Sequence, residues 1–185
     1  DSKAFALLGR NLGRFLSTLH GTPLHQFSKS LDRDRDSLPH WTAMIDDAAR
    51  YLKPRLEIGR WNRVNRKLGK SIKRIARFEY EPALRHGDFG FGNFLFDEQD
   101  RLSGVIDFGS AGLGDPAVDI AGLTATNGPG EKLVDRVRTS YPAVDDLLER
   151  ARVYRATFPL QHALLGAKGD DEDAVREGLE SYLDD

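Results

Sequence analysis

The sequence has 185 residues, of which 39% are hydrophobic and 30% charged, with 27 Lys and Arg against 29 Asp and Glu. A chain of this length and composition can bury a core of its own, which excludes a collagen, a coiled-coil rod and a wholly disordered protein. The net charge of −2 gives no overall reason to expect nucleic acid or an anionic membrane as a partner. The lack of cysteine excludes a disulfide framework, cysteine-ligated zinc and a cysteine nucleophile, and it fits a cytoplasmic location.

No apolar run approaches the ~20 residues that a membrane-spanning helix needs, so we expect no membrane partner. No charged-then-apolar signal segment begins the sequence either. The first residue is Asp1 and the single methionine is Met44, so we expect that the sequence does not begin at a translation start.

The first expected helix covers residues 1–19, where apolar residues recur at helical spacing. These are Phe5, Leu8, Leu12, Phe15, Leu16 and Leu19. Residues 24–38 are polar, with alternating Asp and Arg, and predict a loop. Pro39 then begins a second helix that ends near Pro54.

A basic amphipathic helix is predicted over residues 60–77. Its apolar face consists of Trp61, Val64, Leu68, Ile72 and Ile75. Within residues 50–77 there are eleven Lys and Arg and one acid, Glu57, whereas residues 140–185 are acidic. Such a segment could bind nucleic acid or another anionic partner. We instead favour a solvated face whose charges pair with the acidic C-terminal third, which makes nucleic acid the less favoured partner.

Short β-strands are predicted in the middle of the chain, at residues 83–86, 94–96 and 104–106. The last two are separated by turn-forming residues, so they predict a β-hairpin. Pro116 begins a helix that runs to about residue 123, and further helices are expected at about 130–140, 143–166 and 171–183. The predicted fold class is therefore α+β, mainly helical, with a small central antiparallel element.

The residues with catalytic chemistry gather in this β element. His86 and Asp88 are followed by Asn93, five residues after the Asp, and Asp107 begins an Asp-Phe-Gly sequence. These spacings are those of a kinase catalytic loop and metal-binding element. Phosphoryl transfer needs a carboxylate that orients the attacking hydroxyl, and Asp88, on a tight loop, can supply it.

A magnesium site is predicted from the ends of the hairpin. Asn93 begins the first strand and Asp107 follows the second, and antiparallel pairing brings those ends together. Amide and carboxylate oxygens suit Mg²⁺, which keeps several waters and so needs only two protein ligands beside nucleotide phosphates. The glycines at 87, 90 and 92 allow a sharp turn and leave room for phosphates. The same string matches neither a dinucleotide fingerprint nor a P-loop, and a metallophosphoesterase would need more histidines.

Taken together, His86-Gly87-Asp88…Asn93, Val105-Ile106-Asp107-Phe108-Gly109 and Gly114-Asp115-Pro116…Asp119 resemble the aminoglycoside phosphotransferase and choline kinase family. Leu16-Ser17-Thr18-Leu19-His20 resembles the Leu-His end of that family's helix after the hinge between its lobes. The resemblance implies a protein-kinase-like fold, in which Asp88 is the catalytic Asp, His86 supports its loop, and Asn93 and Asp107 ligate magnesium.

The resemblance also implies roles for four further residues. Leu95 and Ile106 would form the apolar floor under the adenine of ATP (or GTP). Asp115 would brace the catalytic loop through backbone hydrogen bonds, and Asp119 matches a position with a structural role. The other histidines, His20 among them, are expected to be packed or surface residues.

One departure from the family is large, because no glycine-rich phosphate loop or lysine strand precedes the first helix. We therefore interpret residues 1–185 as the C-terminal lobe, with the N-terminal nucleotide-binding lobe absent from the sequence, and we expect the isolated lobe to turn over little. The expected activity is transfer of a γ-phosphoryl group to the hydroxyl of an aminoglycoside, macrolide or metabolite. The alternative is a non-catalytic module that binds an anionic partner through residues 50–77.

Overall fold

The computed structural model describes residues 2–26, 38–125 and 130–184, so most of the predicted loop at 24–38 lies outside the described residues. The chain forms two compact units. The sheet unit combines Asp1–Arg35 with Tyr80–Arg155, and the helical unit combines Asp36–Glu79 with Ala156–Asp185. Each predicted site residue belongs to the sheet unit.

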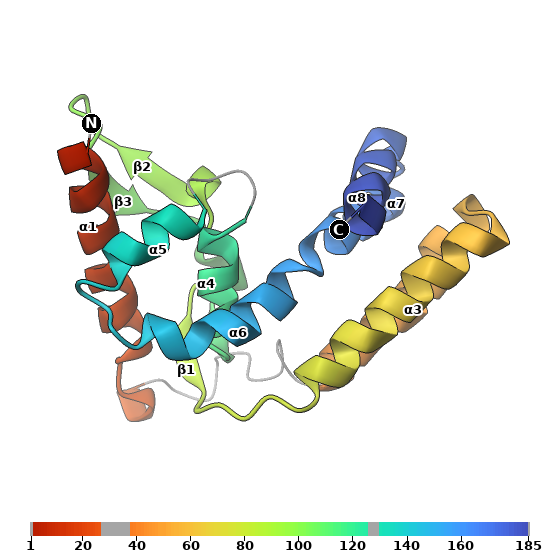
Figure 1. Cartoon of the computed structure of the whole chain (residues 1–185), viewed down its shortest axis with the longest axis horizontal. Helices are drawn as coiled ribbons and strands as arrows, with labels where there is room; N and C mark the ends of the chain where they lie inside the picture. The colour runs from red at the N-terminus through yellow and green to blue at the C-terminus, as the bar shows by residue number, and fades with distance from the viewer. Residues whose placement is uncertain (1, 27–37, 126–129, 185) are drawn as a thin grey trace. The chain divides into compact units, whose positions relative to one another are not determined.

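The helices of the sheet unit are α1 (Ser2–His20), α4 (Ala117–Leu123), α5 (Glu131–Val137) and α6 (Val144–Arg155). Helix α1 packs against α5, and α4 packs against α6 (Figure 1). A methyl group at Gly9 would overlap the side chain of Arg136, so the lack of a side chain at Gly9 lets α1 and α5 approach closely. Leu12 and Leu16 on α1 are completely buried, as their helical spacing predicted.

The strands of the sheet unit form two antiparallel pairs. In one, β1 (Ala83–Arg85) pairs with β4 (Gly112–Gly114), and in the other, β2 (Phe94–Phe96) pairs with β3 (Leu102–Val105). The second pair is the predicted hairpin. Strand β4 was not predicted, because three residues with glycine at both ends show no alternation of apolar and polar residues. Its pairing with β1 fixes the strand that leads into the catalytic loop.

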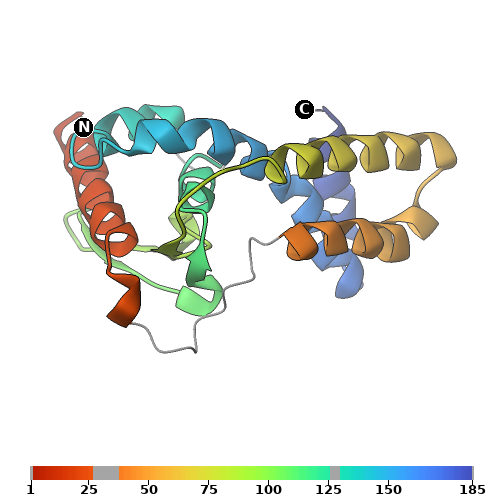
Figure 2. The same cartoon turned by 90° about the horizontal axis from the view of Figure 1, so that it is seen from below.

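The helical unit consists of α2 (Leu38–Asp47), a π-helical turn (Ala48–Leu52), a 3₁₀ turn (Lys53–Arg55), α3 (Ile58–Ile75), α7 (Phe158–Lys168) and α8 (Glu172–Asp184). Figure 2 shows α2 and α3 running alongside one another. A Cβ at Gly178 would lie 2.6 Å from the carbonyl oxygen of Pro159, so Gly178 permits the close packing of α8 on α7.

The helix predicted at residues 143–166 is in fact two helices. Helix α6 ends at Arg155 and α7 begins at Phe158, with Pro159 in its first turn. Proline has no N–H and is tolerated at the start of a helix, where the N–H would lack an intrahelical partner. The break is also where the chain passes from the sheet unit to the helical unit.

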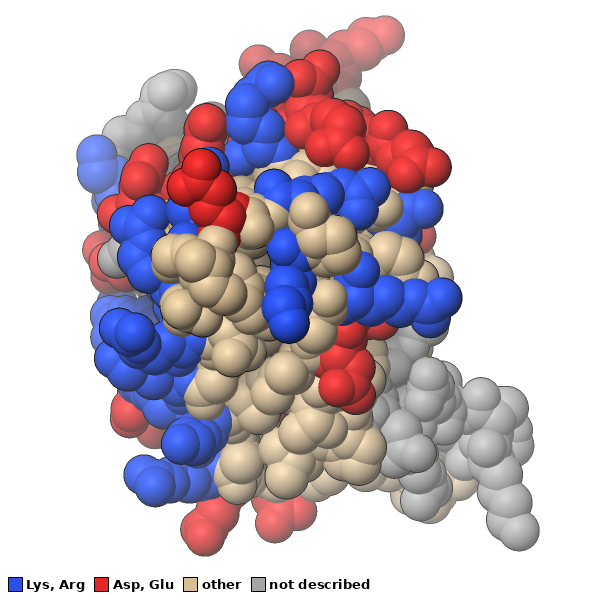
Figure 3. All heavy atoms as spheres, turned by 90° about the vertical axis from the view of Figure 1, so that its right-hand side faces the viewer, with Lys and Arg blue, Asp and Glu red and all other residues tan. Residues whose placement is uncertain are grey.

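The expected pairing of the basic helix with the acidic C-terminal third is wrong for most of its charges. Arg55, before the helix, does lie near Asp170 and Glu172, and Lys67 donates to the carbonyl of Tyr182. Within the part of the chain that the structure describes, the exposed cations at positions 60, 63, 66, 70, 73 and 77 have no ion pair or hydrogen bond. In Figure 3, Lys and Arg lie along the left edge of the face turned to the viewer and also across its upper half.

The fold agrees with the predicted class, a mainly helical α+β fold with a small antiparallel hairpin. Among the residues with described structure, none of the helices is both long and apolar enough to cross a bilayer.

Candidate active site

The predicted catalytic loop, residues 86–93, leaves β1 through a sharp turn at Gly87. Gly87 has a φ of 83°, a conformation that side chains disfavour. A Cβ here would also overlap the carbonyl group of Ser110 and the guanidinium of Arg85. Glycine is therefore required at this position both by its dihedral angle and by the neighbouring backbone.

A buried carboxylate on α4 holds the start of this loop. Asp119 accepts hydrogen bonds from the backbone N–H of His86, at 2.9 Å, and of Gly87, at 2.7 Å, through its two oxygens. The Asp119 side chain is fully buried, so the loop is tied to α4 by charge-assisted bonds in a dry environment. Asp119 thus makes backbone hydrogen bonds of the kind that the family resemblance implied for Asp115.

Asp115 instead anchors α6. Its carboxylate binds the guanidinium of Arg150 at 2.7 and 3.1 Å, accepts from the hydroxyl of Tyr154, and accepts from the N–H of Ala117 at the start of α4. The last bond caps the start of α4, since a carboxylate oxygen accepts from a backbone N–H of the first turn. Asp115 is fully buried, and its ion pair with Arg150 compensates its charge.

The Asp119 carboxylate has a third hydrogen-bond partner, the side chain of His20, which sequence patterns did not predict. His20, the last residue of α1, places its Nε2 3.0 Å from Asp119 and its Nδ1 2.8 Å from the hydroxyl of Tyr141. Burial raises the pKa of Tyr141 to about 12, and its hydroxyl shares a hydrogen bond with Nδ1 of His20. His20 then donates from Nε2 to Asp119, and the three side chains link α1 to the catalytic loop.

His86 forms hydrogen bonds through both nitrogens of its ring. Its Nε2 lies 2.9 Å from the carbonyl oxygen of Ile106, and its Nδ1 lies 3.2 Å from the backbone nitrogen of Asp88. A carbonyl requires a donor and an N–H requires an acceptor, so the neutral ring with the proton on Nε2 satisfies both. The fully buried imidazole thus joins Asp88 to the strand that leads to the Asp-Phe-Gly segment.

Asp88 and Asn93 meet at the two ends of the loop. The Asn93 amide nitrogen donates to the Asp88 backbone carbonyl at 2.8 Å and to the Asp88 carboxylate at 3.0 Å. Asp88 is exposed, so its carboxylate is held from one side and open to solvent on the other. The amide oxygen of Asn93 is left for another partner.

The hairpin places Asn93 and Asp107 at the same end. Phe94 pairs with Val105, and the N–H of Ile106 donates to the carbonyl of Asn93 at 2.9 Å, one residue before Asp107. Asp107 has a φ of 62°, the left-handed region that Asp tolerates, which ends the strand and leaves its carboxylate exposed. Asn93 therefore contacts Asp88 and lies at the same end of the hairpin as Asp107.

An aromatic cluster beneath the loop keeps these residues in place. Phe89 is fully buried and stacks on Phe15 of α1 with ring centroids 5.5 Å apart. The His86 ring lies 4.6 Å from the ring of Phe108. On α4, a Cβ at Gly122 would come within 2.9 Å of the Phe89 carbonyl, so the loop lies directly on that helix. Contacts of this kind contribute about 0.5–1.5 kcal/mol per aromatic pair beyond area burial.

The residues predicted as an adenine floor lie on one face of the hairpin. Leu95 pairs with Gly104, and Ile106 follows Gly104 by two residues, so the two side chains are diagonal neighbours on the same side. They are 47% and 43% exposed, which is a large exposure for apolar side chains. An apolar face that is open to solvent is suited to a flat aromatic ligand.

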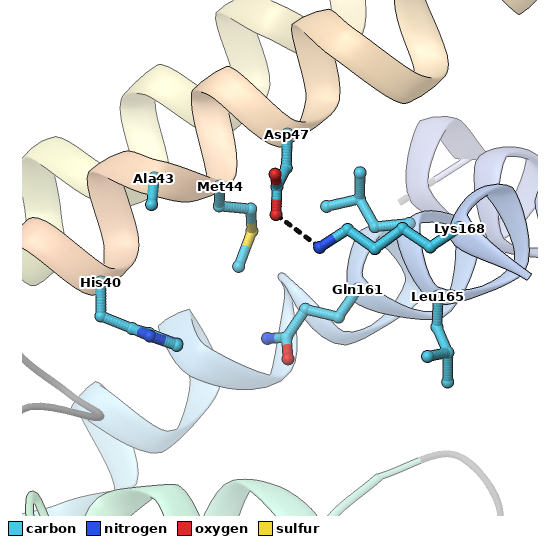
Figure 4. Close-up of a pocket in the computed structure, with 8 residues that line it drawn as sticks. His40, Ala43, Met44, Asp47, Gln161, Leu165 and Lys168 are labelled. Carbon is cyan, nitrogen blue, oxygen red and sulfur yellow. Dashed lines mark hydrogen bonds and ion pairs between the residues drawn. The ribbon is translucent and has the colours of Figure 1, made fainter.

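A separate hollow of about 300 Å³ lies in the helical unit, between α2 and α7 (Figure 4). Met44 and Leu164 form part of its apolar wall, and Asp47 and Lys168 form an ion pair of 2.6 Å at one end. The charges of Asp47 and Lys168 compensate one another within that pair. None of the predicted site residues lines it.

The sequence predicted the loop residues but not the groups that hold them. Sequence patterns did not predict the contacts of His20, Arg150 and Asp119. Each of these residues contacts a residue more than 30 positions away. The Leu-His ending of the first helix was the one available signal for His20.

Comparisons with known proteins identify related sequences and similar folds. Residues 6–154 match the model of a phosphotransferase enzyme family. Viomycin phosphotransferase from Streptomyces vinaceus is 39% identical over 104 residues, which is 54% of this chain and 36% of that protein. The chain thus spans about a third of the length of this relative.

Solved structures of antibiotic phosphotransferases share the fold. The gentamicin complex of APH(2″)-IIa matches with a TM-score of 0.75 at 23% identity, over 99% of this chain and 63% of that one. The GDP complex of wild-type aminoglycoside 2′-phosphotransferase-IIIa matches with a TM-score of 0.77 at 22% identity, over 97% and 61%. Macrolide 2′-phosphotransferase type I matches with a TM-score of 0.71 at 18% identity, over 95% and 58%.

Proposed function

The chain belongs to the phosphotransferase enzyme family, and from that premise we propose that it transfers the γ-phosphoryl group of ATP or GTP to a hydroxyl group of a small molecule. The observation that carries the proposal is the hydrogen bond between Asn93 and the carboxylate of Asp88, in a hairpin whose register brings Asp107 to the same end. Phosphoryl transfer depends mainly on positioning and charge stabilisation, and this arrangement can supply both.

Asp88 would orient the acceptor. Its exposed carboxylate can accept a hydrogen bond from an incoming hydroxyl while Asn93, the His86 ring and the tied loop backbone hold it still. A fixed carboxylate aligns an oxygen lone pair with the phosphorus and takes up the hydroxyl proton as the new bond forms.

Asn93 and Asp107 fit a magnesium ion. Both offer hard oxygen donors, and the Asn93 amide is oriented with its nitrogen toward Asp88, which leaves its oxygen as a ligand. Among the residues that the structure describes, no group of three or more His, Cys, Asp or Glu could hold a metal alone. Two protein ligands, completed by phosphate oxygens and water, match the way proteins hold Mg²⁺. Bound there, the ion would neutralise charge on the transferring phosphate.

Leu95 and Ile106 would contact the nucleotide base from below, since they form an exposed apolar pair beside the two proposed ligands. We further propose that residues 1–185 are the C-terminal lobe of a two-lobed kinase. The chain spans 61–63% of two similar solved phosphotransferases, which leaves room in the whole protein for a lobe that grips the phosphates.

The acceptor would be a hydroxylated antibiotic. Support comes from the identity of 39% with viomycin phosphotransferase over 104 residues. Several similar structures have aminoglycosides bound, including gentamicin and kanamycin. Viomycin is the first compound to test, because that relative is closer in sequence than the structural neighbours.

The test is an acceptor screen with the two-lobed protein. Viomycin, gentamicin, kanamycin and a macrolide are each incubated with Mg²⁺ and either ATP or GTP, and release of nucleoside diphosphate is followed beside mass spectrometry of the acceptor. We expect one compound to gain the mass of a phosphoryl group with one equivalent of diphosphate. Diphosphate release that no acceptor stimulates, or no turnover with either nucleotide, would contradict the proposal.

A further inference from the structure

Helix α3 carries charge of a single sign. Every ionisable side chain between Ile58 and Ile75 is Lys or Arg. Six exposed cations, one of them just beyond the helix, form what we name the α3 stripe: Arg60, Arg63, Arg66, Lys70, Lys73 and Arg77. Among the described residues, none of the six has an ion pair or a hydrogen bond, so the stripe is not neutralised by this part of the chain.

The stripe is narrow and long. At about 100° per residue its members fall within an arc of roughly 140°, and at about 1.5 Å per residue they extend over roughly 25 Å. The opposite side of α3 is its buried face, which includes Trp61, Val64 and Leu68. The stripe is thus a continuous row of cations on the outer side of an anchored helix.

This arrangement is unfavourable for the helix itself. All charged pairs at spacings of three or four residues within α3 are like-charged, and each such pair destabilises a helix by about 0.2–0.5 kcal/mol. The helix dipole favours Lys73 near the C-terminus but opposes Arg60 and Arg63 near the N-terminus. Acidic residues among these cations would stabilise the helix and keep its surface soluble. Because they are lacking within α3, we infer that the stripe binds an anionic partner.

We propose that the α3 stripe binds the phosphate backbone of a nucleic-acid duplex, a function separate from phosphoryl transfer and independent of it. A row about 25 Å long matches a regular array of anions, whereas a single small anion would contact one or two of the six side chains. Duplex DNA presents one charge per about 1.7 Å of its axis, which supplies such an array.

Two observations favour a duplex over other polyanions. The apolar face of α3 is buried, so the helix has no side available for insertion among lipid chains. The stripe contains no aromatic side chain on which unpaired bases could stack, which argues against a single strand. Contacts to phosphates alone would be independent of base sequence and strongly dependent on salt.

The experiment measures binding of the purified protein to a fluorescent DNA duplex of about 20 base pairs by anisotropy, between about 50 and 200 mM salt. If about five phosphates are neutralised, the logarithm of the association constant falls against the logarithm of salt concentration with a slope of about −4.5. The triple variant Arg63→Gln, Lys70→Gln, Arg77→Gln removes the central line of the stripe. We expect it to make the slope shallower by about 3 units, one for each removed phosphate contact.

A matched control removes the same number of charges from the sheet unit. Arg10, Arg14 and Lys132 are exposed cations, and their triple change to Gln lowers the net charge equally. We expect this control to keep the wild-type slope. Equal weakening by both triples would assign binding to net charge and overturn the proposal, as would no binding at about 50 mM salt. Binding to phosphatidylserine vesicles but not to the duplex would also overturn it.

Discussion

The carboxylate of Asp119 accepts the backbone N–H of Gly87 at 2.7 Å, 32 residues earlier in the chain. This bond joins α4, which follows the Asp-Phe-Gly segment, to the loop at residues 86–93, which precedes that segment. The same carboxylate also binds the N–H of His86 and the ring of His20. Asp119 is therefore the residue whose charge holds α1, α4 and the catalytic loop together.

We predict that Asp119→Asn destabilises the protein. The neutral amide keeps the shape of the side chain but replaces one acceptor oxygen with an NH₂ group that faces other donors. Loss of charge-assisted bonds in a buried site lowers the free energy of unfolding by about 2–3 kcal/mol. Urea denaturation measures this change, with Asp46→Asn as the control, because Asp46 is exposed. A loss no larger than that of the control would contradict the role of Asp119.

The turn at Gly87 gives a second prediction. Gly87→Ala places a Cβ against the Ser110 carbonyl at a positive φ, and we expect a loss of about 2 kcal/mol or more. Gly69→Ala, in α3, meets nothing within 4 Å and should stabilise the protein by about 0.5–1 kcal/mol. Thermal unfolding of the two variants should therefore shift in opposite directions. Shifts in the same direction would show that the turn tolerates a side chain.

The sequence predicted those features of the site that depend on residues close together in the chain. The spacing of Asp88 and Asn93 and the hairpin between Asn93 and Asp107 are set within about 20 residues, so pattern and turn chemistry are sufficient. The amphipathic helices followed from periodicity in the same way, although the break before Pro159 did not, since apolar residues continue through it.

The parts that escaped prediction depend on contacts between distant segments. Asp115 and Asp119 are both buried acids at the start of one helix, and no local feature tells which faces the catalytic loop and which faces α6. Strand β4 exists because β1 pairs with it, and its own three residues favour no structure. The composition of residues 50–77 predicted the positive charge of the α3 stripe. It could not show whether acidic side chains of the C-terminal third form ion pairs with the stripe.

The buried pair of Asp115 and Arg150 leads to a third prediction. Arg150→Met removes the ion pair that Arg150 makes with a fully buried carboxylate, and we expect a loss of about 3–5 kcal/mol. Asp115→Asn in the same chain removes the charge that needs compensation. The double variant should therefore be less destabilised than the sum of the single variants, as measured in a double-mutant cycle by urea denaturation. Simple additivity would contradict a direct coupling.

Tyr141 gives a pH dependence. Its pKa is raised to about 12 by burial, whereas the unfolded chain ionises this group near 10. The folded state therefore holds a proton that the unfolded state has lost between these values, so stability falls as the pH rises from about 10 to 12. Burial also raises the pKa of Tyr182, which adds to the same slope.

The contribution of Tyr141 is isolated by Tyr141→Phe. Free energies of unfolding measured at several pH values from about 9 to 11 should decline less steeply in this variant than in the wild type. The decline in stability with pH that remains in Tyr141→Phe comes from Tyr182 and from the other groups that titrate in this range. Identical slopes for both proteins would mean that the Tyr141 hydroxyl is not held in its neutral form against His20.

The most direct measurement of the central claim is phosphoryl transfer by Asp88→Ala in the two-lobed protein, with nucleotide affinity determined on the same preparation by isothermal titration with Mg²⁺. Because Asp88 is exposed and is proposed to orient the acceptor hydroxyl, its loss should lower the transfer rate by about 10²–10⁴-fold. Nucleotide affinity should stay within about twofold, since Asn93 and Asp107 remain. Full transfer activity in the variant would contradict the assignment of Asp88 as the catalytic carboxylate.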